Sequence, residues 1–262
     1  MNNSIEILAQ HWRNCGLEDG DLVLVHSSLK RLLLKVKNEF GQIITPQDVY
    51  DSLLEAVGED GTLILPLFNF DFPKVNFFDI RNSPSHMGAL TEIGRLAPNS
   101  VRTGHPIYSF SILGKLQKEF EGIDNISGYG PDSPFAKIKE LDGKIAIIGL
   151  SDQNSMTSYH FVEEQNKVDY RYYKDFAGEY INASGEKHDK VYSLFVRDLD
   201  KGVKTDVNRM MEYLWEIGAY KGERHDEGFG MRTIKFNDFF DEVNHCIRKG
   251  NAINFLYSID KN

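Results

Sequence analysis

A hydroxyl, an imidazole and a carboxylate follow one another at three-residue spacing in the middle of the chain. These residues are Thr157, His160 and Glu163. The sequence predicts a helix that opens at Thr157, and residues three apart on a helix lie on the same face. A histidine with a carboxylate partner is a typical general base, because the carboxylate fixes the tautomer and raises the basicity of the ring. Thr157, one turn earlier, could then donate to a developing oxyanion.

The place of this polar row favours a site, although the same spacing also occurs in ordinary surface or capping contacts. The apolar run Ile145–Ile148, ended by Gly149, predicts a strand that is buried on both faces. The polar row follows the carboxyl end of that strand, where open α/β sheets bind ligands. The motif G-x-S-x-G is absent, so the histidine would deprotonate a substrate rather than a nucleophile of the protein.

A second polar group follows an earlier predicted strand. The segment His26-Ser27-Ser28-Leu29 offers hydroxyls and backbone N–H groups that suit a phosphate, and the alternative is an ordinary polar strand end. Neither G-x-G-x-x-G nor G-x-x-x-x-G-K-[S/T] occurs, so no Rossmann or P-loop nucleotide site is predicted. His105, before Pro106, is a further candidate, with a structural histidine as the alternative.

Strands that alternate with helices surround these candidates, which indicates an α/β fold with a central, largely parallel sheet and flanking helices. After Tyr180 the pattern becomes a β-hairpin or meander over residues 181–207, followed by helices, a less regular α+β portion. We expect a single domain over residues 1–262, with a core at 1–180 and a C-terminal portion at 181–262. The predicted helices cover residues 4–15, 45–57, 85–96, 135–140, 206–219 and 236–248, and the predicted strands residues 21–26, 62–66, 107–113 and 145–148.

A turn-rich loop at residues 67–85 carries five phenylalanines without clear periodicity. Rings of this size must pack against something. Two interpretations stay open: the rings cover the core, or they form the wall of a substrate pocket.

The composition excludes several classes of protein. A net charge of −9 lacks the basic footprint of nonspecific nucleic-acid binding. No apolar run approaches the roughly 20 residues of a membrane span, and the first residues lack the pattern of a signal peptide. Cys15 and Cys246 form no metal motif, and we find no metal-ligand spacing among the scattered histidines. We therefore expect a cytoplasmic protein without a metal, a nucleic-acid partner or a membrane partner.

Six segments, in this order, resemble the aminoglycoside 3-N-acetyltransferase family, which is distinct from the GCN5-type acetyltransferases. Together they cover about residues 15–175, and the C-terminal third carries much less of the pattern. The segments are VLVHSSL (23–29), EAVGEDGTLILP (55–66), SPSHMGALTE (83–92), RTGHPIYSF (102–110), DSPFAK (132–137) and TSYHFVEE (157–164).

The resemblance implies direct transfer of acetyl from acetyl-CoA to a primary amine of an amino sugar. His160 would be the base, Glu163 its partner, and Thr157 would contact the region of the thioester carbonyl. The residues that would bind acetyl-CoA are His26, Ser27, Ser28, Leu29 and Lys30 at the pyrophosphate, and His86, Met87, Gly88, Tyr108 and Ser109 along the pantetheine. The residues expected at the acceptor are Asp71, His105, Asp132, Glu164 and Arg171.

The sequence departs from the family in two respects that leave the acceptor open. Residues 30–48 lack the Gly-rich stretch of many relatives, and Lys167, Arg171 and Lys174 interleave with the acidic residues that an aminoglycoside pocket needs. Basic residues suit a phosphate-bearing acceptor. The alternatives are an aminoglycoside antibiotic 3-N-acetyltransferase (resistance), an N-acetyltransferase for nucleotide-linked amino sugars of surface polysaccharide synthesis, and a catalytically idle CoA- or sugar-binding module. Monomer and homodimer also both stay open.

Overall fold

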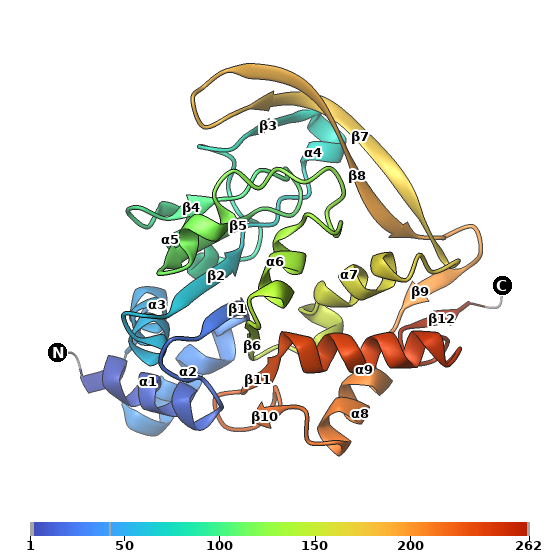
Figure 1. Ribbon diagram of the computed structural model, residues 1–262. Helices are drawn as coiled ribbons and strands as arrows, with labels where there is room; N and C mark the ends of the chain where they lie inside the picture. The colour runs from blue at the N-terminus through green and yellow to red at the C-terminus, as the bar shows by residue number, and fades with distance from the viewer. Residues whose placement is uncertain (1–2, 42, 261–262) are drawn as a thin grey trace.

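A mixed β-sheet runs through the centre of the computed structural model, which describes residues 3–41 and 43–260 (Figure 1). Over these residues the sheet has seven strands in the order β10-β11-β6-β1-β2-β5-β4. Its central strands β1 (Leu22–Ser27), β2 (Thr62–Pro66) and β6 (Lys144–Ile148) run parallel, whereas the outer pairs are antiparallel. The α/β fold with a central sheet is therefore confirmed, and its parallel part lies in the middle.

The central strands are buried on both faces because their residues are apolar without interruption. Leu24 and Ile147 point into one core, and Val23 and Ile148 into the other. Helices α1 (Asn3–Asn14), α2 (Leu29–Phe40) and α3 (Pro46–Val57) contribute to the second of these cores. The first core receives α6 (Pro134–Glu140), α7 (Ser158–Gln165), α8 (Asn208–Glu216) and α9 (Phe236–Arg248).

A long antiparallel hairpin lies outside the central sheet. It consists of β7 (Arg171–Ile181) and β8 (Lys187–Arg197), and β3 (Phe77–Asp79) pairs in parallel with β7. Figure 1 shows the hairpin arching above α6 and α7. The hairpin begins at Arg171 rather than near residue 181 as predicted, because the first half of β7 is exposed and mixes aromatic with charged residues, so it shows no apolar alternation.

The C-terminal portion of the chain also takes part in the central sheet. The C-terminal portion contributes two strands to the central sheet, and β11 pairs antiparallel with β6. The elements whose ranges have not yet been given are α4 (Phe72–Val75), α5 (Ala89–Leu96), β4 (Val101–Arg102), β5 (Phe110–Gly114), β9 (Val203–Thr205), β10 (Lys221–Gly222), β11 (Met231–Lys235), β12 (Tyr257–Ile259) and the 3-10 turns Gln117–Phe120 and Asp152–Asn154.

Two predicted elements begin later than expected. The helix predicted from residue 85 begins at Ala89, because Gly88 has φ of +108°, outside the helical region. The strand predicted from Ile107 begins at Phe110, because the N–H groups of Ile107 and Tyr108 donate to the His105 ring (3.2 and 3.1 Å) instead of to a strand. Helix α2 is an element that the sequence analysis did not predict.

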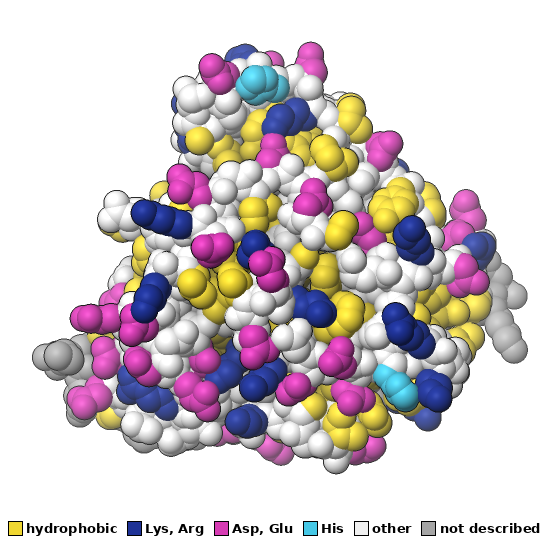
Figure 2. All heavy atoms as spheres, viewed as in Figure 1, with side chains coloured by type: hydrophobic (Ala, Val, Ile, Leu, Met, Phe, Trp, Pro, Cys, Tyr) yellow, Lys and Arg dark blue, Asp and Glu magenta, His cyan; other side chains and the backbone are white. Residues whose placement is uncertain are grey.

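The surface carries both signs of charge. Figure 2 shows acidic and basic side chains interspersed over the face in view, which fits the negative net charge and offers no broad basic field there. Among the described residues, no helix combines the length and apolarity needed to cross a membrane.

Candidate active site

The imidazole of His160 and two charged side chains form a connected group where α7 meets β7. His160 Nδ1 lies 2.7 Å from Glu163 Oε2, and Arg171 Nε lies 2.7 Å from the same oxygen. The Glu163 side chain is 1% exposed and the His160 side chain 21% exposed. The predicted contact between imidazole and carboxylate is therefore present. Because Nδ1 is engaged, Nε2 is the ring nitrogen left for a substrate.

The charges around this pair favour a neutral imidazole beside an ionised carboxylate. Burial opposes the ionisation of Glu163, but Arg171 and His160 outweigh it and hold the pKa of that carboxyl below its usual range. At His160, burial and then Arg171 lower the pKa, against the opposite influence of Glu163. The ring is thus unprotonated near neutral pH and able to accept a proton.

His160 lines two cavities. The first cavity has a volume of about 420 Å³ and lies over the carboxyl ends of the central strands. Its walls come from six parts of the chain, which are His26 with Ser27, residues 66–70, residues 86–91, Tyr108, residues 150–160, and Thr205 with Val207. Phe68 is buried and Phe70 is partly exposed, so the aromatic loop serves both as core cover and as cavity wall.

The second cavity lies between His160 and the hairpin and has a volume of about 330 Å³. It shares Tyr108, His160 and Thr205 with the first cavity. The Tyr129 ring closes one side, with its centroid 5.4 Å from that of His160. The imidazole therefore stands between two spaces in which two different molecules can meet.

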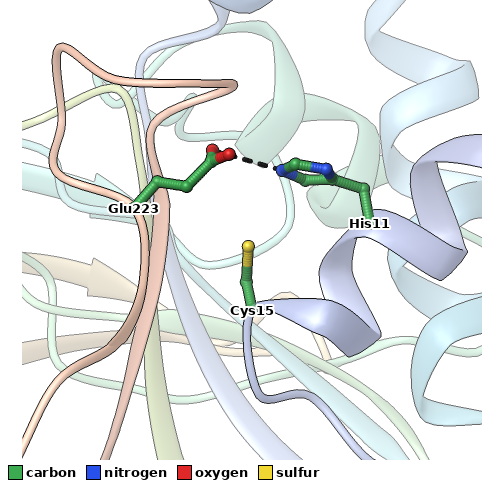
Figure 3. Close-up of side chains that lie close together, drawn as sticks. All are labelled: His11, Cys15 and Glu223. Carbon is green, nitrogen blue, oxygen red and sulfur yellow. Dashed lines mark hydrogen bonds and ion pairs between the residues drawn. The ribbon is translucent and has the colours of Figure 1, made fainter.

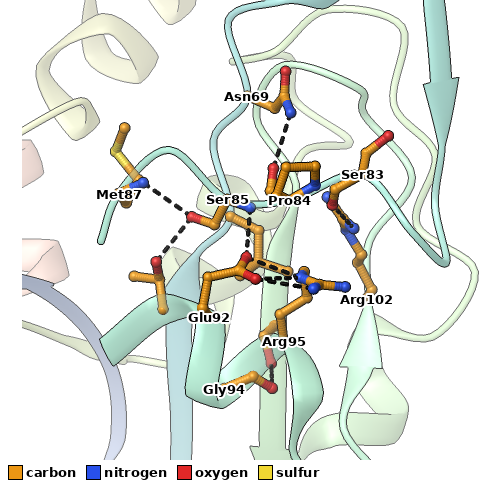
Figure 4. A network of polar contacts seen from close by, with 12 residues as sticks. Asn69, Ser83, Pro84, Ser85, Met87, Glu92, Gly94, Arg95 and Arg102 are labelled. Atoms are coloured by element: carbon orange, nitrogen blue, oxygen red, sulfur yellow. Dashed lines mark hydrogen bonds and ion pairs between the residues drawn. The ribbon is translucent and has the colours of Figure 1, made fainter. Parts of the chain in front are cut away.

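A network of polar contacts holds the turn that brings His86 and Met87 to the first cavity (Figure 4). Glu92 of α5 accepts the N–H of Ser85 at 2.6 Å, and the Ser85 hydroxyl accepts the N–H of Met87 at 3.1 Å. Arg95 pairs with Glu92 at 2.9 Å. The turn has no regular secondary structure of its own, so these contacts fix its position.

Buried charges underlie the first cavity. Arg232, fully buried on β11, donates to Asp152 Oδ1 at 2.7 Å, and the hydroxyls of Tyr159 and Tyr220 donate to Oδ2, each at 2.7 Å. Sequence reasoning missed this cluster, because Asp152 and Arg232 are 80 residues apart. His26 lies nearby, and burial followed by the charge of Arg232 lowers its pKa to about 4.

The residues that the resemblance assigned to acetyl-CoA lie in the first cavity, in a separate groove, or in neither. His26, Ser27, His86, Met87 and Tyr108 line the first cavity. Ser28 and Lys30 line a separate groove along α2, Leu29 packs partly against the core, and Gly88 precedes α5.

Ser109 lies elsewhere. It is fully buried, accepts hydrogen bonds from Arg102 (3.2 and 3.3 Å) and donates to the Leu67 carbonyl at 3.3 Å. It lines neither cavity, and its place along the pantetheine stays a prediction.

The residues expected at the acceptor are not gathered at one place. Asp71 is half exposed and lies 3.2 Å from His86 Nε2, at the rim of the first cavity. Asp132 is exposed and lines neither cavity. Arg171 lines the second cavity, but its charge is paired with Glu163.

Two of those residues are buried away from both cavities. His105 is fully buried under Tyr108, accepts two backbone hydrogen bonds and lines neither cavity, and its contact with the acceptor stays a prediction. Glu164 accepts from the hydroxyls of Ser127 (2.7 Å) and Tyr173 (3.3 Å), and burial raises its pKa. Both residues support the walls rather than line them.

One cluster of metal-ligand side chains exists outside these cavities (Figure 3). Potential ligand atoms of His11, Cys15 and Glu223 lie within 4.8 Å of one another. His11 lies in the last turn of α1 and Cys15 directly follows the helix, four residues further on, a ligand spacing that the sequence analysis overlooked. Glu223 accepts the N–H groups of Phe229 (2.7 Å) and Gly230 (3.1 Å) and lies 3.2 Å from His11 Nε2. These contacts tie the 223–230 loop to α1.

Known proteins resemble this chain in sequence and in fold. The family profile described as aminoglycoside 3-N-acetyltransferase matches residues 24–245. Aminoglycoside N(3)-acetyltransferase IV of Salmonella sp is 28% identical over 162 residues, which cover 60% of this chain and 57% of that protein. Aminoglycoside N(3)-acetyltransferase VII of Streptomyces paromomycinus is 27% identical over 177 residues, which cover 60% and 58%. The chain thus spans less than two thirds of the length of these relatives.

Solved structures share the fold over nearly the whole chain. AAC-IIIb in its binary complex with CoASH superimposes with a TM-score of 0.78 at 19% identity, covering 94% of this chain and 96% of that one. AAC-VIa bound to sisomicin has a TM-score of 0.77 at 20% identity, covering 95% and 98%. At this level of identity the likeness shows the fold.

Proposed function

The chain belongs to the aminoglycoside 3-N-acetyltransferase family, and we propose that it transfers an acetyl group from acetyl-CoA to a primary amine of an amino sugar. The observation that carries this proposal is the imidazole of His160, which lines both cavities and is held by a buried carboxylate. One cavity can hold the acetyl donor while the other holds the amine, so no covalent intermediate on the protein is needed.

The chemistry assigns a task to each member of the polar group. His160 Nε2 first takes a proton from the sugar ammonium, and the neutral amine nitrogen then attacks the thioester carbonyl carbon. The new C–N bond forms, the C–S bond breaks, and the departing CoA sulfur receives the second proton that this nitrogen loses. Glu163 stabilises the transient imidazolium, and Arg171 keeps Glu163 ionised. Thr157, at the start of α7 and on the wall of the first cavity, would donate to the oxyanion.

We assign the acetyl-CoA arm to the first cavity. Met87, Tyr108 and Phe68 give it apolar walls suited to pantetheine, and it reaches His160 at its inner end. Ser27 belongs to this cavity and Ser28 to the adjoining groove on α2, where Lys30 also lies. The Ser28 hydroxyl makes no capping hydrogen bond at the start of α2, so hydroxyl and helix N-terminus are available to the pyrophosphate.

The acceptor would occupy the second cavity, beside Tyr129 and the hairpin. Two classes of acceptor are considered. The family assignment suggests aminoglycosides, and the sequence suggests nucleotide-linked amino sugars. Relatives named for aminoglycoside N(3)-acetylation favour the first class. The basic residues of β7 and β8 favour the second.

A thiol-release assay with acetyl-CoA tests the proposal. Aminoglycosides and nucleotide-linked amino sugars are offered as separate panels, with His160→Ala as the control variant. Turnover with either panel, lost in His160→Ala, supports an acetyltransferase. Acetyl-CoA binding without thiol release in either panel would overturn the proposal and favour the idle binding module.

A further inference from the structure

We infer that the second cavity selects an anionic acceptor, an amino sugar that carries phosphate, through Lys174 and Arg197 of the hairpin. This inference rests on the proposed function, since it concerns the molecule that presents its amine to His160. It goes further in naming the charge of the acceptor and the two side chains that recognise it.

The lining of the second cavity is cationic. Arg171, Lys174 and Arg197 contribute basic side chains to it, and none of the described residues that line it is an aspartate or a glutamate. An aminoglycoside carries several ammonium groups, and such a cation is repelled by a wall of the same sign. A phosphate or diphosphate is attracted by the same wall and can accept hydrogen bonds from both an ammonium and a guanidinium.

The three cations differ in whether their charge is available. Arg171 is buried and paired with Glu163 at 2.7 Å, so its charge is already neutralised. Lys174 and Arg197 are exposed, and neither forms an ion pair with a carboxylate within the part of the chain that the structure describes. The sequence analysis named Lys167, Arg171 and Lys174 as basic residues that suit a phosphate. Lys167 does not line the second cavity, and we assign the role of Arg171 to Arg197 instead.

Other basic residues of the hairpin have carboxylate partners. Lys187, near the other end of the hairpin, pairs with Glu179 at 3.0 Å, and Lys190 pairs with Asp124. Asp198, next to Arg197 in the chain, pairs with Lys201 at 3.1 Å. Within β7 and β8, the described lysines and arginines that lack a carboxylate partner are therefore Lys174 and Arg197, which line the cavity.

Both cations lie near the end of the hairpin that meets α7. Arg197 lies opposite Arg171 and Lys174 lies opposite Leu194, so the two side chains start from opposite faces of the hairpin, and both line the cavity. The field of Arg197 reaches the imidazole and contributes to its lowered pKa. The rings of Tyr129 and Tyr108, with centroids 4.9 Å apart, give the sugar or base an aromatic surface between the phosphate and the imidazole.

Titration with UDP tests the inference without relying on turnover. Binding of UDP is measured calorimetrically in the presence of saturating CoA, so that the nucleotide cannot enter the cavity assigned to acetyl-CoA. Lys174→Gln/Arg197→Gln is compared with the wild-type protein and with Lys187→Gln, which removes a lysine of the same hairpin outside the cavity. All substituted side chains are exposed, and the midpoint of thermal unfolding confirms that each variant is folded.

We expect the double variant to bind UDP about 10-fold more weakly, because two charge-assisted contacts are lost, and Lys187→Gln to bind it as the wild type does. With UDP-glucosamine as acceptor, KM should rise in the double variant by a similar factor, while KM for glucosamine and for acetyl-CoA stays the same. Unchanged UDP binding in the double variant would overturn the inference. So would a rise in KM for acetyl-CoA alone, which would assign the two cations to the CoA phosphates.

The failure of this inference and of the proposed function give different results. If no acceptor supports thiol release, the proposed function fails, whatever the UDP titration shows. If sisomicin is acetylated with a lower KM than UDP-glucosamine and UDP does not bind, the acetyltransferase stands and the anionic acceptor is excluded.

Discussion

The two cavities that meet at His160 differ in charge and in origin. Among the described residues that line the first cavity, the only carboxylate belongs to Asp152, which Arg232 neutralises, and none is a lysine or an arginine. The second cavity carries two unpaired cations. Segments that follow buried strands build the first, whereas an exposed hairpin builds much of the second. The comparison indicates that the fold determines the lining of the first cavity. Exposed residues of the hairpin, which can be replaced without disturbing the core, determine the charge of the second.

The largest effect should come from His160, one of the three residues that the two cavities share. His160→Ala is expected to lower kcat by about 1,000-fold, within the range of general-base loss, because no other group replaces its proton transfer. Calorimetry should show CoA and UDP binding unchanged, because both cavities keep their other walls. A variant that retains more than a tenth of the wild-type rate would contradict the role of the imidazole.

Glu163 pairs with both His160 and Arg171. Its replacement should lower the stability of the protein as well as the reaction rate. Glu163→Gln leaves Arg171 buried without its carboxylate, so we expect the free energy of unfolding to fall by about 3–5 kcal/mol. Urea denaturation measures this loss, with the exposed Glu186→Gln as the control. A stability equal to wild type would show that Arg171 finds another partner.

Acid should lower the stability of the folded protein, because two histidines near the cavities are buried in their uncharged form. Burial lowers the pKa of His26, on the first cavity, and of His105, beneath the second, to about 4. Between about pH 6.5 and pH 4 the unfolded chain binds protons at these rings and the folded chain does not, so stability is lost as pH falls. Each ring should contribute about 3 kcal/mol over this window.

The pH dependence is checked by repeating urea denaturation across the window in wild type and in His105→Gln. The variant should lose stability less steeply. Equal slopes in the two proteins would show that His105 is protonated in the folded state.

A smaller effect should distinguish the first cavity from the second. Glu92→Gln weakens the contact that holds the turn of His86 and Met87, and we expect KM for acetyl-CoA to rise about 5-fold, the equivalent of one hydrogen bond. KM for the acceptor should not change. Steady-state kinetics measures both, with the exposed Glu119→Gln as the control. An increase confined to the acceptor would reverse the assignment of the cavities.

Much of the first cavity could be predicted from the sequence, because its signals are local. Uninterrupted apolar runs mark β1, β2 and β6, and the polar residues that follow β1 and β6 end at the same edge of the sheet. The contact between His160 and Glu163 follows from helical spacing alone.

The rest depends on pairings between distant parts of the chain. Arg197 reaches the second cavity only because β8 pairs with β7, a register that exposed residues do not specify. Tyr129 and Arg232 come to their places from loops and strands far from His160 in the chain. His105 and Ser109 were assigned to ligands through the family resemblance, yet tertiary packing buries both.

The initial rate of thiol release, measured while acetyl-CoA and the acceptor are varied together, tests most directly whether the acetyl group passes straight from one cavity to the other. Two cavities joined at His160 allow both substrates to be bound at once, so double-reciprocal plots should give lines that intersect. Parallel lines would contradict the account, because they indicate an acetylated protein intermediate formed before the acceptor binds.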